Sequence, residues 1–202
     1  GTVSPLTFSD QDLSGQYGEN LAWEHSVESS NGSLRVIGKA VASGDYDGDM
    51  VSDIAVVRPG TGLWAVRNFT RQYFGSSGDI PVPGDYDGDG RSDIAVFRRD
   101  IGLWAISGFS RIYWGSESDL PVSGDYDGDG CCDIGIYRSG TGLWAILGIT
   151  RRYFGTEQDY ALPGDYDGDG NFDLTIFRAG SGLWASWNLT RCYFGTDGDI
   201  PV

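Results

Sequence analysis

The sequence has few of the residues that carry enzymatic chemistry and few of those that cross-link a chain. Its 202 residues include one histidine, one methionine and three cysteines, Cys131, Cys132 and Cys192. The histidine, His25, has no serine or cysteine nucleophile motif around it. The odd number of cysteines leaves at least one thiol unpaired within the chain. We therefore expect neither a nucleophilic active site nor a repeated disulfide framework.

Basic residues and long apolar runs are also scarce. Lysine and arginine together number 14 against 29 acidic residues, which gives a formal net charge of −15. Nucleic acids and anionic membrane surfaces repel a chain of this charge. No apolar run approaches the ~18 residues that a membrane-spanning helix needs. We therefore expect no nucleic-acid partner and no membrane insertion.

Glycine and aromatic residues are abundant instead, and they recur with a fixed period. The chain has 32 glycines and 13% aromatic residues, without the three-residue glycine period of collagen. The string GDYDGD begins at Gly44, Gly84, Gly124 and Gly164, and GLWA begins at Gly62, Gly102, Gly142 and Gly182. A 40-residue spacing that never slips predicts one supersecondary module repeated along the chain.

Two architectures have a period near 40 residues, the four-stranded propeller blade and the helical HEAT-type pair. Residues 93–98 and 102–106 are short, rich in β-formers and apolar at both alternating positions, as in strands covered on both faces. Apolar residues never follow helical spacing for three turns. The second repeat therefore predicts four strands, near 79–84, 93–98, 102–107 and 110–114. The expected fold class is all-β, a β-propeller of four-stranded blades.

The arithmetic of the repeats predicts about five blades in a single domain, 1–202. Four repeats are complete, and they cover 39–78, 79–118, 119–158 and 159–198. Residues 21–38 resemble part of a blade, and 199–202 match the first strand of a further repeat. We expect these two remnants to combine into a fifth blade, with the C-terminal strand innermost. Residues 1–20 match no repeat, and they are expected to form an arm or a missing strand.

Each complete repeat carries the loop D-x-D-G-D-x-x-x-D, which points to calcium. Four carboxylates at positions 1, 3, 5 and 9 of a tight glycine-rich loop converge on one point, and Ca²⁺ takes 6–8 oxygen ligands. A valine or isoleucine replaces the position-12 glutamate of an EF-hand, so the position-7 carbonyl is expected to assist. The predicted ligands of the four Ca²⁺ ions are Asp45, Asp47, Asp49, Val51 and Asp53; Asp85, Asp87, Asp89, Arg91 and Asp93; Asp125, Asp127, Asp129, Cys131 and Asp133; and Asp165, Asp167, Asp169, Asn171 and Asp173.

The charge of these loops favours a metal over a merely acidic turn. Without metal, like charges at ~4 Å repel by roughly 1–4 kcal/mol per pair, depending on the effective dielectric. Four Ca²⁺ would bring the formal charge to −15 + 8 = −7. Because each loop joins two strands of one blade, the expected role of the metal is structural. Met50 replaces the position-6 glycine of the other loops, so the first site is expected to be strained or weaker.

Residues 40–202 resemble FG-GAP or VCBS-type repeats, which are similar to those of integrin α-subunit propellers. The resemblance rests on Tyr-Phe-Gly, a short linker and Pro-Val-Pro-Gly-Asp-Tyr-Asp-Gly-Asp-Gly. It implies a β-propeller with calcium between the first two strands of each blade. It also implies an extracellular setting with adhesion or carbohydrate recognition. Integrin propellers have seven blades, the composite fifth blade here lacks a calcium loop, and residues 1–38 are not covered.

Other residues recur once per repeat and are expected to build the blades. Packing between adjacent blades needs one large residue in each, although aromatic platforms also stack on sugar rings. An arginine and an aspartate at fixed positions favour an ion pair within or between blades. The residues are Trp64, Trp104, Trp144 and Trp184; Arg58, Arg98, Arg138 and Arg178; and Asp79, Asp119, Asp159 and Asp199.

These features predict a calcium-stabilised, non-catalytic binding, adhesion or surface-structural module at the cell surface or outside the cell. A protein or glycan ligand is expected. One alternative is a carbohydrate-binding lectin, and another is a subunit of an extracellular fibre that self-assembles by strand exchange between its termini. Three sequons are glycosylation sites if the protein is eukaryotic, at Asn31, Asn68 and Asn188.

Overall fold

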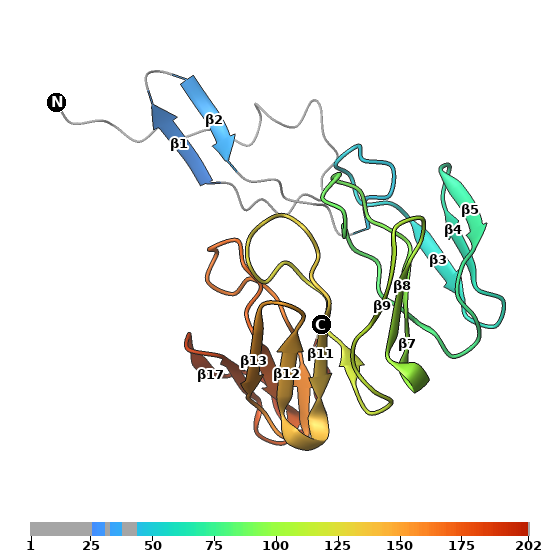
Figure 1. The fold of residues 1–202 in the computed structure, drawn as a ribbon. Coiled ribbons are helices and arrows are strands. Elements are labelled where there is room, and N and C mark those ends of the chain that lie inside the picture. Colours follow the sequence, from blue (N-terminus) through green and yellow to red (C-terminus); the bar gives the residue numbers. More distant parts are fainter. Residues whose placement is uncertain (1–25, 31–32, 38–43, 202) are drawn as a thin grey trace. The chain divides into compact units, whose positions relative to one another are not determined.

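The computed structural model describes residues 26–30, 33–37 and 44–201, in two compact units, Gly1–Ala40 and Val41–Val202 (Figure 1). In the first unit, strands β1 (Ser26–Ser30) and β2 (Ser33–Ile37) form an antiparallel hairpin. The predicted arm at 1–20 and part of the predicted partial blade at 21–38 lie outside the described residues. The prediction of a single domain over 1–202 stays a prediction.

The second unit is all-β and consists of four antiparallel sheets, in sequence order. The first sheet has three strands and the other three have four. The strands of the first two sheets are β3 (Ala55–Arg58), β4 (Leu63–Val66) and β5 (Thr70–Tyr73), then β6 (Ile80–Pro81), β7 (Ala95–Arg98), β8 (Leu103–Ile106) and β9 (Ser110–Tyr113). Those of the last two are β10 (Leu120–Pro121), β11 (Gly135–Arg138), β12 (Leu143–Ile146) and β13 (Thr150–Tyr153), then β14 (Asp159–Ala161), β15 (Thr175–Arg178), β16 (Leu183–Ser186) and β17 (Arg191–Tyr193).

The predicted strands of the second repeat are confirmed to within a few residues. The first is the shortest, because β6 covers only Ile80–Pro81 and Gly84 pairs with Asp93 through an isolated bridge. In the described ranges the helices are 3₁₀ turns of three residues, η1 (Arg99–Ile101), η2 (Ser139–Thr141) and η3 (Ala179–Ser181). None of the described helices could span a membrane.

Burial follows the position of each strand in its sheet. In the second sheet, β8 is buried at every residue, whereas the outer strand β9 alternates between half-buried and exposed. Apolar side chains on both faces of a strand need cover on both sides, and the neighbouring sheets supply it. The apolar sequence of the middle strands therefore predicts their burial correctly.

The repeated tryptophans join each sheet to the next. Trp64, Trp104 and Trp144 are at most 1% exposed, and their indole Nε1 groups donate to the carbonyl of the aromatic residue ten positions later. Trp64 packs in one cluster with Ile94 and Val96 of the second sheet. The packing role predicted for these three residues is confirmed.

The recurring arginines and aspartates form ion pairs within three of the sheets. Arg98, Arg138 and Arg178 each donate through Nε and Nη2 to both oxygens of a carboxylate 19 residues earlier, at 2.7–2.9 Å. The partners are Asp79, Asp119 and Asp159. The hydrogen bonds from Arg98 lower the pKa of Asp79. The predicted structural role of these pairs is confirmed.

The hairpin between the last two strands explains two of the sequons. Asn68 and Asn188 have φ values of 62° and 59°, and the equivalent residues Gly108 and Gly148 also have positive φ. Asparagine tolerates the left-handed region better than other non-glycine residues. Turn geometry therefore accounts for these asparagines without glycosylation, whereas Asn31 lies outside the described residues.

The composite fifth blade is not observed within the described ranges. Residues 199–201, expected to form the closing strand, belong to no strand. The first sheet consists of β3, β4 and β5, and most of the segment expected to supply its inner strand, 39–44, lies outside the described residues. The number of blades stays a prediction.

We expect Arg138→Ala to lower the free energy of unfolding by about 2–4 kcal/mol, because it strands the fully buried Asp119 carboxylate without its charge partner. Urea denaturation measures the loss. The control is Arg111→Ala, at an exposed residue of β9. Its free energy of unfolding should stay within about 0.5 kcal/mol of that of the parent chain. Equal losses in the two variants would contradict a structural role for the ion pair.

Candidate metal centre

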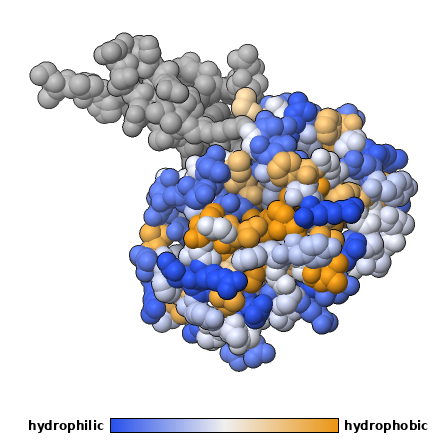
Figure 2. Space-filling view, viewed as in Figure 1, coloured by the Kyte–Doolittle hydropathy of each residue, from blue (hydrophilic) through white to orange (hydrophobic). Residues whose placement is uncertain are grey.

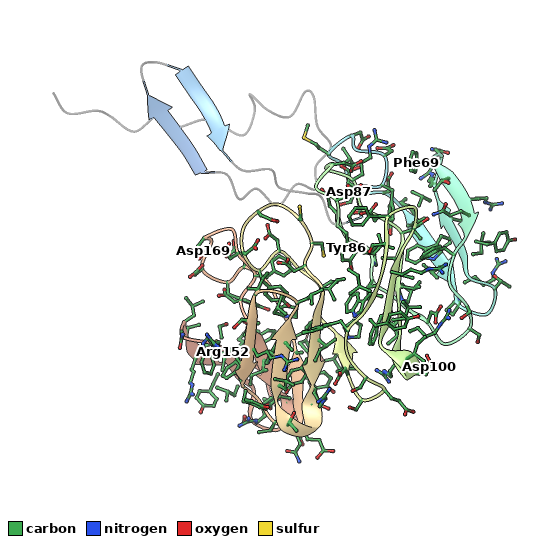
Figure 3. All side chains as sticks on the ribbon, in the orientation of Figure 1. Phe69, Tyr86, Asp87, Asp100, Arg152 and Asp169 are labelled. Carbon is green, nitrogen blue, oxygen red and sulfur yellow. The ribbon has the colours of Figure 1, made fainter. Side chains whose placement is uncertain are left out.

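One acidic loop precedes the second strand of each of the four repeats. In the last three sheets the loop connects the first strand to the second, and its base is closed by a backbone hydrogen bond such as Asp93 N to Gly84 O at 2.7 Å. Figure 3 shows Asp87 and Asp169, from the second and fourth loops, at the same end of the sheets, whereas Asp100 of turn η1 lies at the opposite end. The acidic loops therefore lie at the same end of their sheets.

Three carboxylates converge in each loop, at positions 1, 3 and 9. One oxygen from each lies within 4.8 Å of the other two. Oxygen atoms at this separation can share one cation of the size of Ca²⁺, whose ligand distances are ~2.3–2.6 Å. The four clusters are Asp45, Asp47 and Asp53; Asp85, Asp87 and Asp93; Asp125, Asp127 and Asp133; and Asp165, Asp167 and Asp173.

Backbone N–H groups hold the clustered carboxylates in place, as the second loop illustrates. Asp85 Oδ1 accepts from Gly88 N at 2.8 Å, and its Oδ2 accepts from Gly90 N at 2.7 Å. Asp93 Oδ2 accepts from Tyr86 N at 2.9 Å. The equivalent bonds recur in the third loop at 2.7–2.9 Å. The repeated sequence thus fixes the same carboxylate geometry before any ion binds.

The predicted four-carboxylate site is incomplete in one respect. The position-5 aspartates stand outside the clusters. Their Oδ1 atoms accept from the backbone N–H two residues later at 2.8 Å, an Asx turn that holds the side chain locally. The residues are Asp49, Asp89, Asp129 and Asp169. Their metal contacts stay a prediction, as do those of the position-7 carbonyls.

The first loop keeps the shape of the others despite its methionine. Met50 has φ 67°, beside 89° for Gly90 and 86° for Gly130. A left-handed conformation costs a non-glycine residue about 1–2 kcal/mol. The expected backbone strain is therefore present at Met50, and weaker metal binding at this loop stays a prediction.

Burial and neighbouring charges raise the pKa of the position-9 carboxylates of the last three loops. Burial, followed by the charges of Asp127, Asp125 and Asp129, raises the pKa of Asp133 to about 6. The same causes raise the pKa of Asp93 and of Asp173. A bound cation would relieve this repulsion, so the donor set of three carboxylates fits a hard divalent cation.

Adjacent loops are also joined to one another. The position-8 N–H of one loop donates to the position-1 carbonyl of the loop before it, from Ser92 to Asp45 at 2.5 Å and from Cys132 to Asp85 at 2.6 Å. Phe172 donates to Asp125 in the same way, also at 2.6 Å. The residue that anchors each cluster by its side chain thus anchors the next loop by its backbone.

The two adjacent cysteines take part in this contact between loops. A Cβ at Gly84 would lie 2.6 Å from Cys132 Sγ, and one at Gly88 would lie 2.9 Å from Cys131 Sγ, so these glycines make room for the thiols. Burial raises the pKa of Cys132 to about 12. All three thiols, including the exposed Cys192, are free. Cys131 and Cys132 thus act as packing residues, and His25 lies outside the described residues.

We expect the metal-free protein to become more stable as the pH falls from 7 towards 5. The folded-state pKa of Asp133 is about 6, above its ordinary value of 3.8, so folding takes up a proton in this interval. Stability gained in this way is complete below the ordinary pKa and is lost as the pH rises through the folded one. Below about pH 4 the lowered pKa of Asp79 acts in the opposite direction.

Chemical denaturation in a chelator at several pH values measures this dependence. Asp133→Asn should flatten it, and excess calcium should reverse it, because the ion needs the deprotonated carboxylates. Metal-free protein that loses stability steadily from pH 7 to pH 5 would contradict the expectation.

Comparison with family models, with curated proteins and with solved structures finds no match for this chain. The metal centre therefore rests on the chain's own residues and geometry, and the resemblance to FG-GAP or VCBS-type repeats remains a prediction from the sequence.

Proposed function

We propose that this chain is a calcium-stabilised β-propeller module that acts outside the cell as a non-catalytic binding or adhesion protein. The observation that carries the proposal is the convergence of the same three carboxylates in each of four loops. One such cluster is common on protein surfaces, but four at equivalent positions, each ordered by the same backbone bonds, favour a repeated metal site.

The donor set favours calcium among the biological cations. Asp45, Asp47 and Asp53 offer only hard oxygen atoms, which suit calcium, magnesium or manganese rather than softer metals. Calcium tolerates irregular cages of protein oxygens, whereas magnesium keeps several of its waters. In the proposed site the position-5 carboxylate and the position-7 carbonyl complete the coordination after a small local rearrangement.

The propeller assignment rests on the way the sheets follow one another. Each of the last three sheets packs its second strand against the tryptophan of the sheet before it, and the three inter-sheet cores use equivalent residues. Repetition of one contact between successive four-stranded sheets is what blades of a propeller share.

Calcium availability supports a location outside the cell. At ~1 mM free calcium and a Kd of ~10 µM, each occupied site would add about 2.7 kcal/mol to the stability of the folded state. The same sites would be nearly empty at the far lower calcium concentration of a cytosol. A protein that depends on four such ions is therefore best suited to an extracellular environment.

Exposed aromatic and apolar side chains supply a surface for a ligand. Figure 2 shows hydrophobic side chains gathered in the middle of one face, with hydrophilic ones around them. Each outer strand also ends in a tyrosine that is 69–76% exposed, and these residues are Tyr73, Tyr113, Tyr153 and Tyr193. Aromatic residues are enriched at protein interfaces, which favours a binding role.

We expect native mass spectrometry in millimolar calcium to find four ions bound to each chain, and Asp87→Asn to reduce the number to three. Asp87 is the clustered carboxylate of the second loop that is most open to solvent, so its loss should not disturb packing. Asp100→Asn, a matched charge change in η1 at the other end of the sheets, should retain four.

Chelation should also lower the melting temperature of the chain by more than about 10 °C, because four bound ions stabilise the folded state. A chain that binds no calcium and melts unchanged in a chelator would show that the loops are acidic turns only.

A pocket between the third and fourth sheets favours carbohydrate binding as a second candidate function. Its volume is about 360 Å³, and it is lined by Phe154, Ser186, Arg191 and the turn Trp187–Thr190. Trp187 is half-buried and meets Phe154 edge to face, with 5.5 Å between ring centroids. Aromatic rings beside hydroxyl, amide and guanidinium groups form the mixed surface that sugar rings require.

The lectin function predicts that Trp187→Ala abolishes binding to a glycan array while the number of bound calcium ions stays the same. Leu147→Ala, at the equivalent position of the third sheet, is the matched control and should leave glycan binding intact. An array without any signal for the parent chain would remove this candidate and favour a protein ligand.

A further inference from the structure

The first sheet exposes an apolar face that its counterparts bury. Ile54 and Val56 are each 63% exposed. The equivalent residues of the next two sheets, Ile94 and Val96 or Ile134 and Ile136, are 2–6% exposed. Full burial of a side chain as large as isoleucine stabilises the folded state by about 1.5–3 kcal/mol. The face formed by Ile54 and Val56, here the β3 face, therefore lacks, in the part of the chain that the structure describes, the cover that its counterparts have.

The fourth sheet exposes the opposite half of the same contact. Tyr166 is 46% exposed and Phe194 is 79% exposed, whereas Tyr46 and Tyr86 are buried. Trp184 is half-buried, although its three counterparts are at most 1% exposed. Tyr166, Trp184 and Phe194 together form what is here termed the trailing face.

The two faces are complementary because the same pairing occurs between every two successive sheets. Tyr46 and Trp64 bury Ile94 and Val96, with Phe74 packed at the edge. The third and fourth sheets repeat this arrangement, where Leu174 and Ile176 pack against Trp144. The trailing face thus has the residues that cover a β3 face in the interior of the array.

Unpaired charges mark the same two places. Arg58 and Asp199 stand at the positions of the Arg98–Asp79 pair, and neither has an ion-pair partner in the described part of the chain. The first repeat carries Lys39 where the other repeats carry the aspartate, so its own sequence offers Arg58 no carboxylate. Asp199 is already positioned as its counterparts are, since its Oδ2 accepts from Thr196 N at 2.7 Å, as Asp79 does from Ser76.

The backbone is complementary as well. Strand β3 has a neighbour only on its β4 side within the described residues, and 199–201 repeat the sequence Asp-Ile-Pro of residues 79–81, the last two of which form β6. In that sheet Ile80 lies opposite Phe97 and Pro81 opposite Val96. The equivalent register would place Ile200 opposite Val57 and Pro201 opposite Val56.

We propose that copies of this chain associate head to tail, with residues 199–201 of one copy added as a strand to β3 of a second copy. Asp199 then pairs with Arg58 of the second copy, and the trailing face covers Ile54 and Val56. The occupant is another copy because both faces are exposed at once, and so do not cover each other within one chain. Such a contact joins different surfaces and produces closed rings or open chains. It does not depend on calcium ligation.

A charge exchange tests the contact directly. Sedimentation velocity from about 1 µM to about 1 mM should show the parent chain gaining mass with concentration. Asp199→Arg and Arg58→Asp, each alone, place like charges together and should weaken association at least about tenfold. An equimolar mixture of the two variants restores an opposite-charge pair at every junction, so it should associate like the parent chain.

Controls separate this proposal from its alternatives. Asp197→Arg and Arg67→Asp make the same charge changes at exposed nearby positions and should associate like the parent chain. Val56→Glu should abolish association, with circular dichroism used to verify that it folds. If the pair instead forms within one chain, each single variant should lower the melting temperature, the double variant Arg58→Asp/Asp199→Arg should restore it and the mixture should not, and this result would overturn the proposal. A parent chain that stays monomeric throughout would also overturn it, and would point to cover by residues 1–43 of the same chain.

Discussion

The array depends on the first aspartate of each of the first three acidic loops, because this residue makes two connections at once. Its carboxylate accepts backbone N–H groups of its own loop, as Asp125 does from Gly128 and Gly130, and so gathers the loop around a cation site. Its carbonyl accepts the N–H of Phe172 in the next loop. The candidate metal site and the stacking of successive sheets are therefore linked at one residue. A change in the geometry of either one should alter the other.

The fold tolerates four acidic loops in a chain of such high negative charge because other contacts hold its strands and sheets together. Burial, followed by the neighbouring carboxylates of the loop, raises the pKa of Asp133 and so disfavours its charged form when no cation is present. The Arg–Asp pairs join strands within three of the sheets, at the end opposite the loops, and the inter-sheet cores join one sheet to the next. Apolar packing and ion pairs thus secure the fold, and in the proposed function a cation bound in each loop adds to its stability.

The sequence predicts features that recur better than features that occur once. The period and the apolar middle strands predict the sheets, and the fixed positions of Asp119 and Arg138 predict their ion pair. The pocket beside Trp187 has no repeated signal, because it arises where one tryptophan meets Phe154 of the preceding sheet. The separate position of Asp129 was also missed. Spacing alone does not reveal that its carboxylate is held by the N–H two residues later. The positive φ of Asn188 is predictable from the sequence, because Gly148 stands at the equivalent position of the preceding repeat.

Departures from the repeat are the best guide to function in a molecule of this kind. Residues that are identical in every repeat have a common structural task, so they cannot distinguish one ligand or one end of the array from another. Lys39 in place of aspartate, Met50 in place of glycine and Trp187 in a hairpin turn each break the pattern. The first leaves Arg58 without a partner in its own repeat. The second strains one loop, and the third lines a pocket. Such exceptions allow a repeat array to distinguish one ligand, or one of its own ends, from another. Here they lie at one end of the array, in one candidate metal site and at one boundary between sheets.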